Sequence, residues 1–181
     1  MSLLKKILLS LFVFLIVVTG YFTYVLFINP KSPMGTAEIQ KGNLNLSVSY
    51  FRPFKKERLI FGTAKEGALV PFDTYWRLGA NMSTKFETAS PISFHGRQLA
   101  AGAYRMYAIP YADHWILALN SEVGAFGYYP PDYANDVMRV NVPTQKGSAS
   151  VEQFTIDFVE DSTGVSMRMR WDTTAVLVGI K

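Results

Sequence analysis

Apolar residues recur at every second position in several segments beyond residue 43. In GVSMRMRW, residues 164–171, the apolar positions run from Val165 to Trp171 with a serine and two arginines between them. Successive side chains of a β-strand point to opposite faces of a sheet, so this pattern predicts a strand with one buried face. The same alternation occurs in residues 43–51, 136–142 and 151–160. These segments predict β structure.

An uncharged apolar segment precedes this region and follows Lys5 and Lys6. It comprises the 22 residues Ile7–Ile28, and a helix of that length spans about 33 Å, enough to cross a hydrocarbon core of about 30 Å. Small residues at 18–20 would suit cleavage of a signal peptide. The apolar segment continues for eight residues beyond Gly20, which favours an uncleaved anchor.

The two lysines also predict an orientation, because basic residues favour the cytoplasmic end of a membrane helix. We expect a single-pass protein of the inner membrane whose C-terminal part is extracytoplasmic, in the periplasm. The predicted parts are a membrane anchor at 1–30, a short tether with the first strand at 31–42, and a β-sandwich domain at 43–181.

Turn residues separate about nine or ten short predicted strands, among them 101–110 and 114–120. No segment after residue 30 has the period of an amphipathic helix. Consecutive strands joined by tight turns pair antiparallel. We therefore predict an all-β fold, an antiparallel β-sandwich of jelly-roll type, preceded by a single N-terminal transmembrane helix.

Composition excludes several classes of function. Without Lys5 and Lys6 the chain has 16 basic and 14 acidic residues, which is not the charge of a nucleic-acid-binding protein. The chain contains no cysteine, so disulfides, thiol nucleophiles and zinc–thiolate sites are excluded. His95 and His114 lack the spacing of a metal-binding pair. No metal, other cofactor or catalytic residue is predicted.

Residues 70–89 contain a first group of candidate ligand-binding residues. Trp76 offers a ring for stacking, Arg77 a planar set of donors, and Asn81 both a donor and an acceptor. The alternative is that Gly79 and Asn81 form a turn or bulge that only the backbone requires.

A second group lies in the loop predicted at 125–136, which contains Tyr128, Tyr129 and Tyr133. Tyrosine rings can stack on a sugar or peptide while the phenol forms hydrogen bonds, or they can cap the core of a sandwich. Trp171 follows two arginines that could bind an anion, although such a face is also typical of the solvated side of a sheet.

Six segments together resemble one bacterial family, the domain of unknown function 2911. They are SVSYFRPFKKERLIFG, LVPFDTYWRLGAN, LAAGAYRMYAIP, HWILALN, DVMRVNV and MRWDTTAVLVGI, in this order, over most of residues 43–180. The resemblance implies an exported all-β domain and no established activity. It also implies that Arg52, Arg77 and Asn81 converge at one end of the sandwich, near the WDTT segment.

We therefore expect a non-catalytic binding or interaction module for a glycan, a peptide or an envelope protein. Two alternatives remain open: a cofactor-free hydrolase or isomerase that uses carboxylates, and a purely structural envelope protein. The predicted ligand-binding residues are Arg52, Trp76, Arg77, Asn81, Tyr128, Tyr129, Tyr133 and Trp171.

Overall fold

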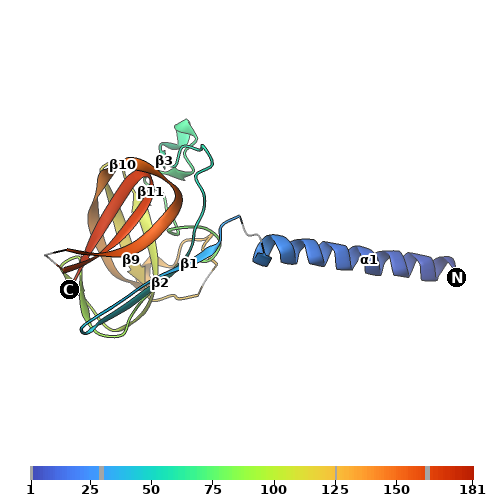
Figure 1. Cartoon of the computed structure of the whole chain (residues 1–181), viewed down its shortest axis with the longest axis horizontal. Helices are drawn as coiled ribbons and strands as arrows, with labels where there is room; N and C mark the ends of the chain where they lie inside the picture. Colours follow the sequence, from blue (N-terminus) through green and yellow to red (C-terminus); the bar gives the residue numbers. More distant parts are fainter. Residues whose placement is uncertain (1, 29–30, 125, 162–163) are drawn as a thin grey trace. The chain divides into compact units, whose positions relative to one another are not determined.

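The computed structural model describes residues 2–28, 31–124, 126–161 and 164–181 (Figure 1). The chain divides into two compact units, Met1–Pro33 and Met34–Lys181. The first contains α1 (Leu3–Thr23), followed by a π-helical turn at Tyr24–Ile28. Within the described residues, α1 is the one helix that is long and apolar enough to span a membrane. The predicted N-terminal apolar helix is thus confirmed.

Nearly all strands of the second unit pair antiparallel with their neighbours. Along its nine-stranded sheet these are β1 (Met34–Lys41), β2 (Leu44–Phe51), β5 (Thr84–Thr88), β8 (Gly102–Pro110), β9 (His114–Asn120), β10 (Asp136–Asp161), β11 (Gly164–Ile180), β6 (Ile92–Phe94) and β7 (Arg97–Leu99). A separate parallel pair joins β3 (Phe61–Gly62) to β4 (Val70–Pro71). The predicted antiparallel all-β fold is confirmed.

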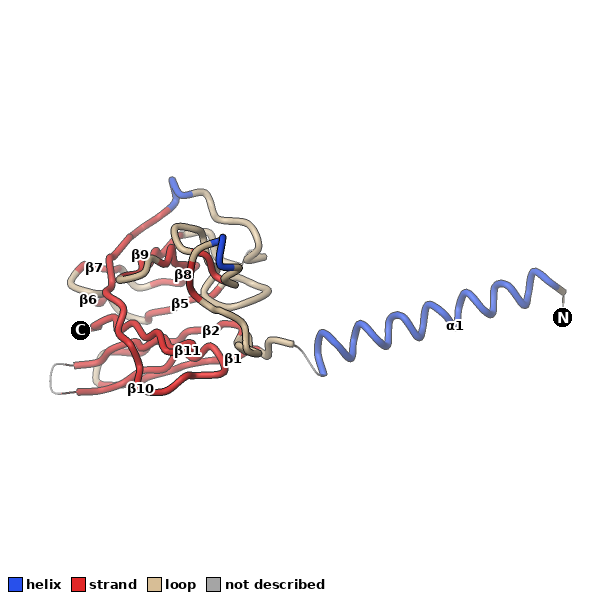
Figure 2. Tube along the Cα trace, turned by 90° about the horizontal axis from the view of Figure 1, so that it is seen from above, coloured by secondary structure: helices blue, strands red, loops and turns tan. Residues whose placement is uncertain are grey.

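The nine-stranded sheet folds into two layers, and strand β10 contributes to both of them. Its first part, up to Pro143, pairs with β9, and the remainder from Thr144 pairs with β11. Figure 2 shows it crossing the unit from the helical turn at Tyr133–Asn135. The sequence pattern predicted two separate strands here, at 136–142 and 151–160, whereas the structure has one. The strand is continuous because Thr144 and the two residues after it pair with β11.

The ends of the sheet fold toward one another. Strands β6 and β7 continue the β5–β8 hairpin and join the end of β11, where Phe94 pairs with Ile180. The chain after β2 pairs with β10, since the N–H of Phe154 donates to the carbonyl oxygen of Pro53 at 3.0 Å. These contacts close the two layers around one core.

Aromatic side chains fill the centre of that core. All three tryptophans are buried there, together with Phe154 and the partly buried Phe61. The ring of Trp76 stacks on that of Trp171 at a centroid distance of 5.9 Å and meets that of Trp115 edge-on at 5.2 Å. Such pairs add to the free energy gained by burying the rings.

The segment Trp76–Asn81 crosses one end of the core in an unusual backbone conformation. Leu78 and Asn81 have φ angles of +55° and +56°, and Gly79 has a φ of +136°. A Cβ atom on Gly79 would overlap the carbonyl oxygen of Phe51. Leu78 is buried, and its carbonyl oxygen accepts a hydrogen bond from Thr84 Oγ1 at 2.6 Å. The fold therefore requires a turn and a glycine at this position.

We predict that Gly79→Ala lowers the free energy of unfolding by about 2–4 kcal/mol, because alanine adds both backbone strain and a clash. Urea unfolding followed by tryptophan fluorescence would measure the change. The matched control is Gly179→Ala in β11, where a Cβ would meet no atom within 4 Å. We expect that variant to change stability by less than about 1 kcal/mol. Equal effects of the two substitutions would contradict the prediction.

Candidate functional site

The outer face of β8 carries two large polar residues that are nevertheless buried. Tyr104, Met106 and Ala108 face the aromatic core, whereas Arg105 and Tyr107 lie on the opposite side of the strand. A single sheet would leave that side exposed to water. Arg105 is only 2% exposed, because Tyr75 and residues 126–133 lie over it. We call residues 126–133 the aromatic loop.

Arg105 holds this loop through its backbone. Its Nη2 donates hydrogen bonds to the carbonyl oxygen of Tyr129 and, at 2.7 Å, to Tyr75 Oη. The ion pairs found among the described residues do not include Arg105, and its Nε is buried there without a partner. A buried charge without a counter-ion is costly, so neutral acceptors must supply its stabilisation.

Tyr75 links Arg105 to a second point on the backbone of the loop, at Gly127. Its hydroxyl donates to the carbonyl oxygen of Gly127 at 2.9 Å, and the N–H of Gly127 donates to the carbonyl oxygen of Asn81 at 3.0 Å. Burial raises the pKa of Tyr75 despite the hydrogen bond from Arg105, so the phenol stays neutral and remains a donor. The aromatic loop is thus joined to both β8 and the turn at Asn81.

A second polar group fixes the end of the aromatic loop. Tyr107 Oη donates to Asp136 Oδ2 at 2.7 Å, and Asn120 Nδ2 donates to Asp136 Oδ1 at 2.8 Å. Burial and the hydrogen bond to Asp136 raise the pKa of Tyr107 far above its ordinary value. The ring of Tyr133 stacks on that of Tyr107. The guanidinium of Arg139 lies 4.9 Å from the centroid of the Tyr133 ring.

The rings of Phe126, Tyr128 and Tyr129 lie largely at the surface, whereas the ring of Tyr133 packs on Tyr107. Phe126, Tyr128, Tyr129 and Tyr133 are 58%, 61%, 70% and 44% exposed. The guanidinium of Arg77 lies 5.6 Å from the centroid of the Tyr128 ring. The result is a group of exposed rings on a backbone that buried side chains hold in place.

The remaining predicted residues lie in different surroundings. Trp76 and Trp171 are 6% and 1% exposed and belong to the core, so neither offers a free face to a ligand. Asn81 is exposed, and its carbonyl oxygen accepts from Arg77 Nη1 at 3.3 Å as well as from the backbone of Gly127. The structure therefore brings Arg77, Asn81 and the aromatic loop together.

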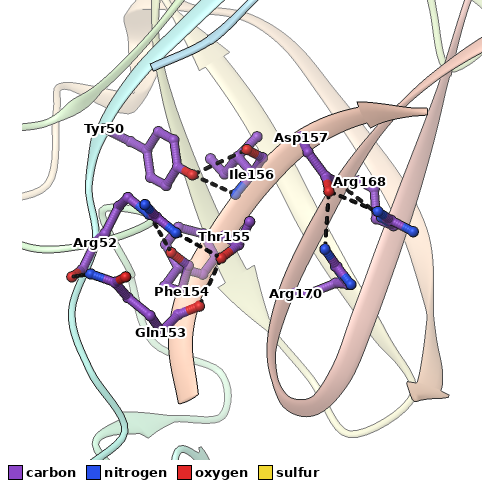
Figure 3. A network of polar contacts seen from close by, with 9 residues as sticks. All are labelled: Tyr50, Arg52, Gln153, Phe154, Thr155, Ile156, Asp157, Arg168 and Arg170. Carbon is purple, nitrogen blue, oxygen red and sulfur yellow. Dashed lines mark hydrogen bonds and ion pairs between the residues drawn. The ribbon is translucent and has the colours of Figure 1, made fainter. Parts of the chain in front are cut away.

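Arg52 lies with β10 instead (Figure 3). Its Nη2 donates to Thr155 Oγ1 at 3.2 Å and its Nε to the carbonyl oxygen of Phe154 at 3.4 Å. The hydrogen bonds described for Arg52 and Arg77 share no partner. The structure thus does not bring the expected group of Arg52, Arg77 and Asn81 into one polar cluster.

Two residues that hold the loop, Tyr75 and Arg105, were not predicted. Arg105 had a recognisable signal, since it is a charged residue within the otherwise apolar run of residues 103–110. No comparable sequence signal marks Tyr75, because its role depends on a loop residue 52 positions further along the chain. Within the part of the chain that the structure describes, no group of three or more histidine or acidic side chains is placed to hold a metal ion.

Fold and site together define an all-β domain with an anchored aromatic loop, in a chain that begins with an apolar helix. The family described as "Protein of unknown function (DUF2911)" matches residues 32–180, and the chain belongs to this family. No match is found among curated proteins, and none among solved structures.

We predict that Tyr75→Phe loosens the aromatic loop and costs about 1–2 kcal/mol of stability, because Gly127 and Arg105 each lose a hydrogen-bond partner. Urea unfolding and amide hydrogen exchange in the loop would measure both effects. The control is Tyr111→Phe, whose hydroxyl bonds to Asp73 at an exposed position, and we expect a change within about 0.5 kcal/mol. Loop exchange rates equal to those of the wild type would contradict the prediction.

Proposed function

We propose that the β domain is a non-catalytic binding module whose ligand is a glycan. The observation that carries this proposal is the aromatic loop, with four exposed rings on a backbone anchored by Arg105 and Tyr75. A loop ordered before binding loses less conformational entropy when the ligand arrives. Buried Arg105 and half-buried Tyr75 hold the backbone of the loop, and its rings remain exposed. This arrangement favours a role of the rings in ligand binding over a role in core packing.

The chemistry of the loop favours a sugar over other ligands. The exposed rings of Tyr128 and Tyr129 offer apolar faces for the C–H groups of a pyranose, and their phenols can exchange hydrogen bonds with its hydroxyls. Arg77 adds donors beside Tyr128. A peptide or an envelope protein could bind the same surface, and the experiment below distinguishes these partners from a glycan.

Among the alternatives, carboxylate catalysis has less support. A general acid in a hydrolase needs a raised pKa, whereas the pKa values of Glu66, Asp113 and Asp172 are all shifted downward. The hydrogen bonds to Thr63 and to His114 lower the first two. For Asp172, burial would raise the pKa, but hydrogen bonds from Lys55 and Ser150 outweigh it.

We predict that the double substitution Tyr128→Ala/Tyr129→Ala weakens glycan binding by at least about tenfold, which corresponds to about 1.4 kcal/mol. The probes are an N-acetylglucosamine tetrasaccharide and soluble peptidoglycan fragments, titrated into the full chain in detergent by calorimetry. Stability should change by less than about 0.5 kcal/mol, because both rings are exposed.

The control for this experiment is Tyr111→Ala. Tyr111 is a surface aromatic residue in the β8–β9 hairpin, at the opposite end of β9 from the aromatic loop. The Tyr111→Ala variant should bind both probes as the wild type does. Saturable binding that survives the double substitution would contradict the role of the loop. Absence of binding to both probes, with binding to an envelope protein, would replace the glycan with a protein partner.

We further propose that α1 is an uncleaved anchor in the inner membrane, with the β domain in the periplasm. The support is the length of the apolar segment and the position of Lys5 and Lys6 before it. We predict that protease added to spheroplasts digests the β domain, and that the mature chain keeps its full mass. A protected domain would contradict the orientation, and a chain shortened by about 20 residues would identify a cleaved signal peptide.

A further inference from the structure

The pairing of β10 with β11 is interrupted near the middle of both strands. The register shifts between Lys146 and Val151 and again between Val151 and Thr155. A pocket of about 150 Å³ lies at this interruption, and its wall includes Gly147, Ser148, Arg170, Asp172, Thr173 and Thr174. That volume holds a group of several non-hydrogen atoms, such as a phosphate or a carboxylate.

One wall of the pocket has a strained backbone. Asp172 lies within β11 and yet has a φ of +51°, a conformation that costs free energy in a residue other than glycine. Its carboxylate accepts from Lys55 Nζ at 2.6 Å and from Ser150 Oγ at 2.7 Å. Asp172 therefore neutralises Lys55, and neither charge requires a further partner.

The arginines beside the pocket have fewer counter-ions. Asp157 accepts two hydrogen bonds from Arg168, at 2.9 and 2.7 Å, and one from Arg170 at 3.0 Å (Figure 3). A single carboxylate thus serves two guanidinium groups. Arg52 adds a third, which bonds to Thr155 Oγ1, and Thr155 is the register partner of Arg170. This cluster of three arginines and Asp157 has a net charge of +2.

Arg170 connects the cluster to the pocket. It contributes to the pocket wall, and 34% of its side chain remains exposed. Ser148, Thr173 and Thr174 also line the pocket, and each of these residues carries a hydroxyl group. Guanidinium and hydroxyl groups together match the oxygen atoms of a compact oxyanion.

We propose that this pocket binds a compact oxyanion, either free or at the end of a larger ligand. Arg170 is its principal cation, and the excess positive charge of the arginine cluster favours the bound anion. The pocket shares no residue with the aromatic loop, so a negative result for oxyanion binding would not affect the proposed glycan binding.

The test is a titration of the ¹⁵N-labelled full chain in detergent micelles with sodium phosphate and, separately, sodium acetate. Sodium chloride at equal ionic strength controls for screening. We expect saturable shifts of the amide signals of Gly147, Thr173 and Thr174 with at least one oxyanion and none with chloride. The phosphate and acetate arms show which oxyanion the pocket prefers. No saturable shift with either would overturn the proposal.

Two pairs of variants locate the binding. Arg170→Gln should weaken it by about tenfold, as expected for the loss of a charge-assisted hydrogen bond. The matched control is Arg97→Gln, because Arg97 is an exposed arginine on β7 that belongs neither to the cluster nor to the pocket wall. Its binding should persist within about threefold. Equal binding by wild type and Arg170→Gln would refute the site.

The second pair applies if Arg170→Gln fails to fold. Ser148 is exposed at the pocket wall, so Ser148→Glu places a negative charge there with little effect on folding. We expect it to abolish oxyanion binding by repulsion, while the neutral Ser148→Gln retains it. Unchanged binding by Ser148→Glu would also refute the site.

Discussion

The indole of Trp76 packs against Trp115 and Trp171 at the same time, and the remaining structure depends on this contact. Trp115 comes from β9 in one layer and Trp171 from β11 in the other, whereas Trp76 comes from the segment before β5. A residue outside the long strands therefore fills the space between the layers. Its backbone joins β8 through two hydrogen bonds with Ala108, at 2.8 and 2.9 Å.

Burial of Trp76 determines where its neighbours point. Trp76 and Leu78 are both buried, and Arg77 between them faces outward toward Tyr128. The turn at Leu78–Asn81 then directs the carbonyl oxygen of Asn81 to Gly127. The segment is thus structural on one side and part of the candidate site on the other. The position of Arg77 beside the aromatic loop is a consequence of core packing.

The alternation of apolar residues predicted the faces of the strands well, because in a two-layer fold one face of each strand is buried. Met167, Met169 and Trp171 are buried as the pattern indicates, and Arg168 and Arg170 face outward. The same rule explains why Trp171 does not join these arginines at the surface. Adjacent residues of a strand point to opposite sides.

The candidate site could be predicted only in part. Tyr128 and Arg77 were identifiable from their residue types, but Arg105 lies on a face that alternation assigns to solvent. It is buried because the aromatic loop folds back over β8, and no local period encodes such a contact. The continuity of β10 through Gly147 was equally hidden, since its pairing with β11 is set by register between distant segments.

Arginine has different roles in the two regions of this domain. Arg105 is buried, and its hydrogen bonds to uncharged oxygens maintain a surface that other residues present. Arg170 is a third exposed and shares its carboxylate with Arg168, so its charge is incompletely neutralised. Replacing the first therefore alters the shape of the aromatic loop, whereas replacing the second alters the electrostatic potential at a pocket. Rising ionic strength should therefore weaken oxyanion binding at Arg170, whereas the hydrogen bonds of the buried Arg105 are little screened.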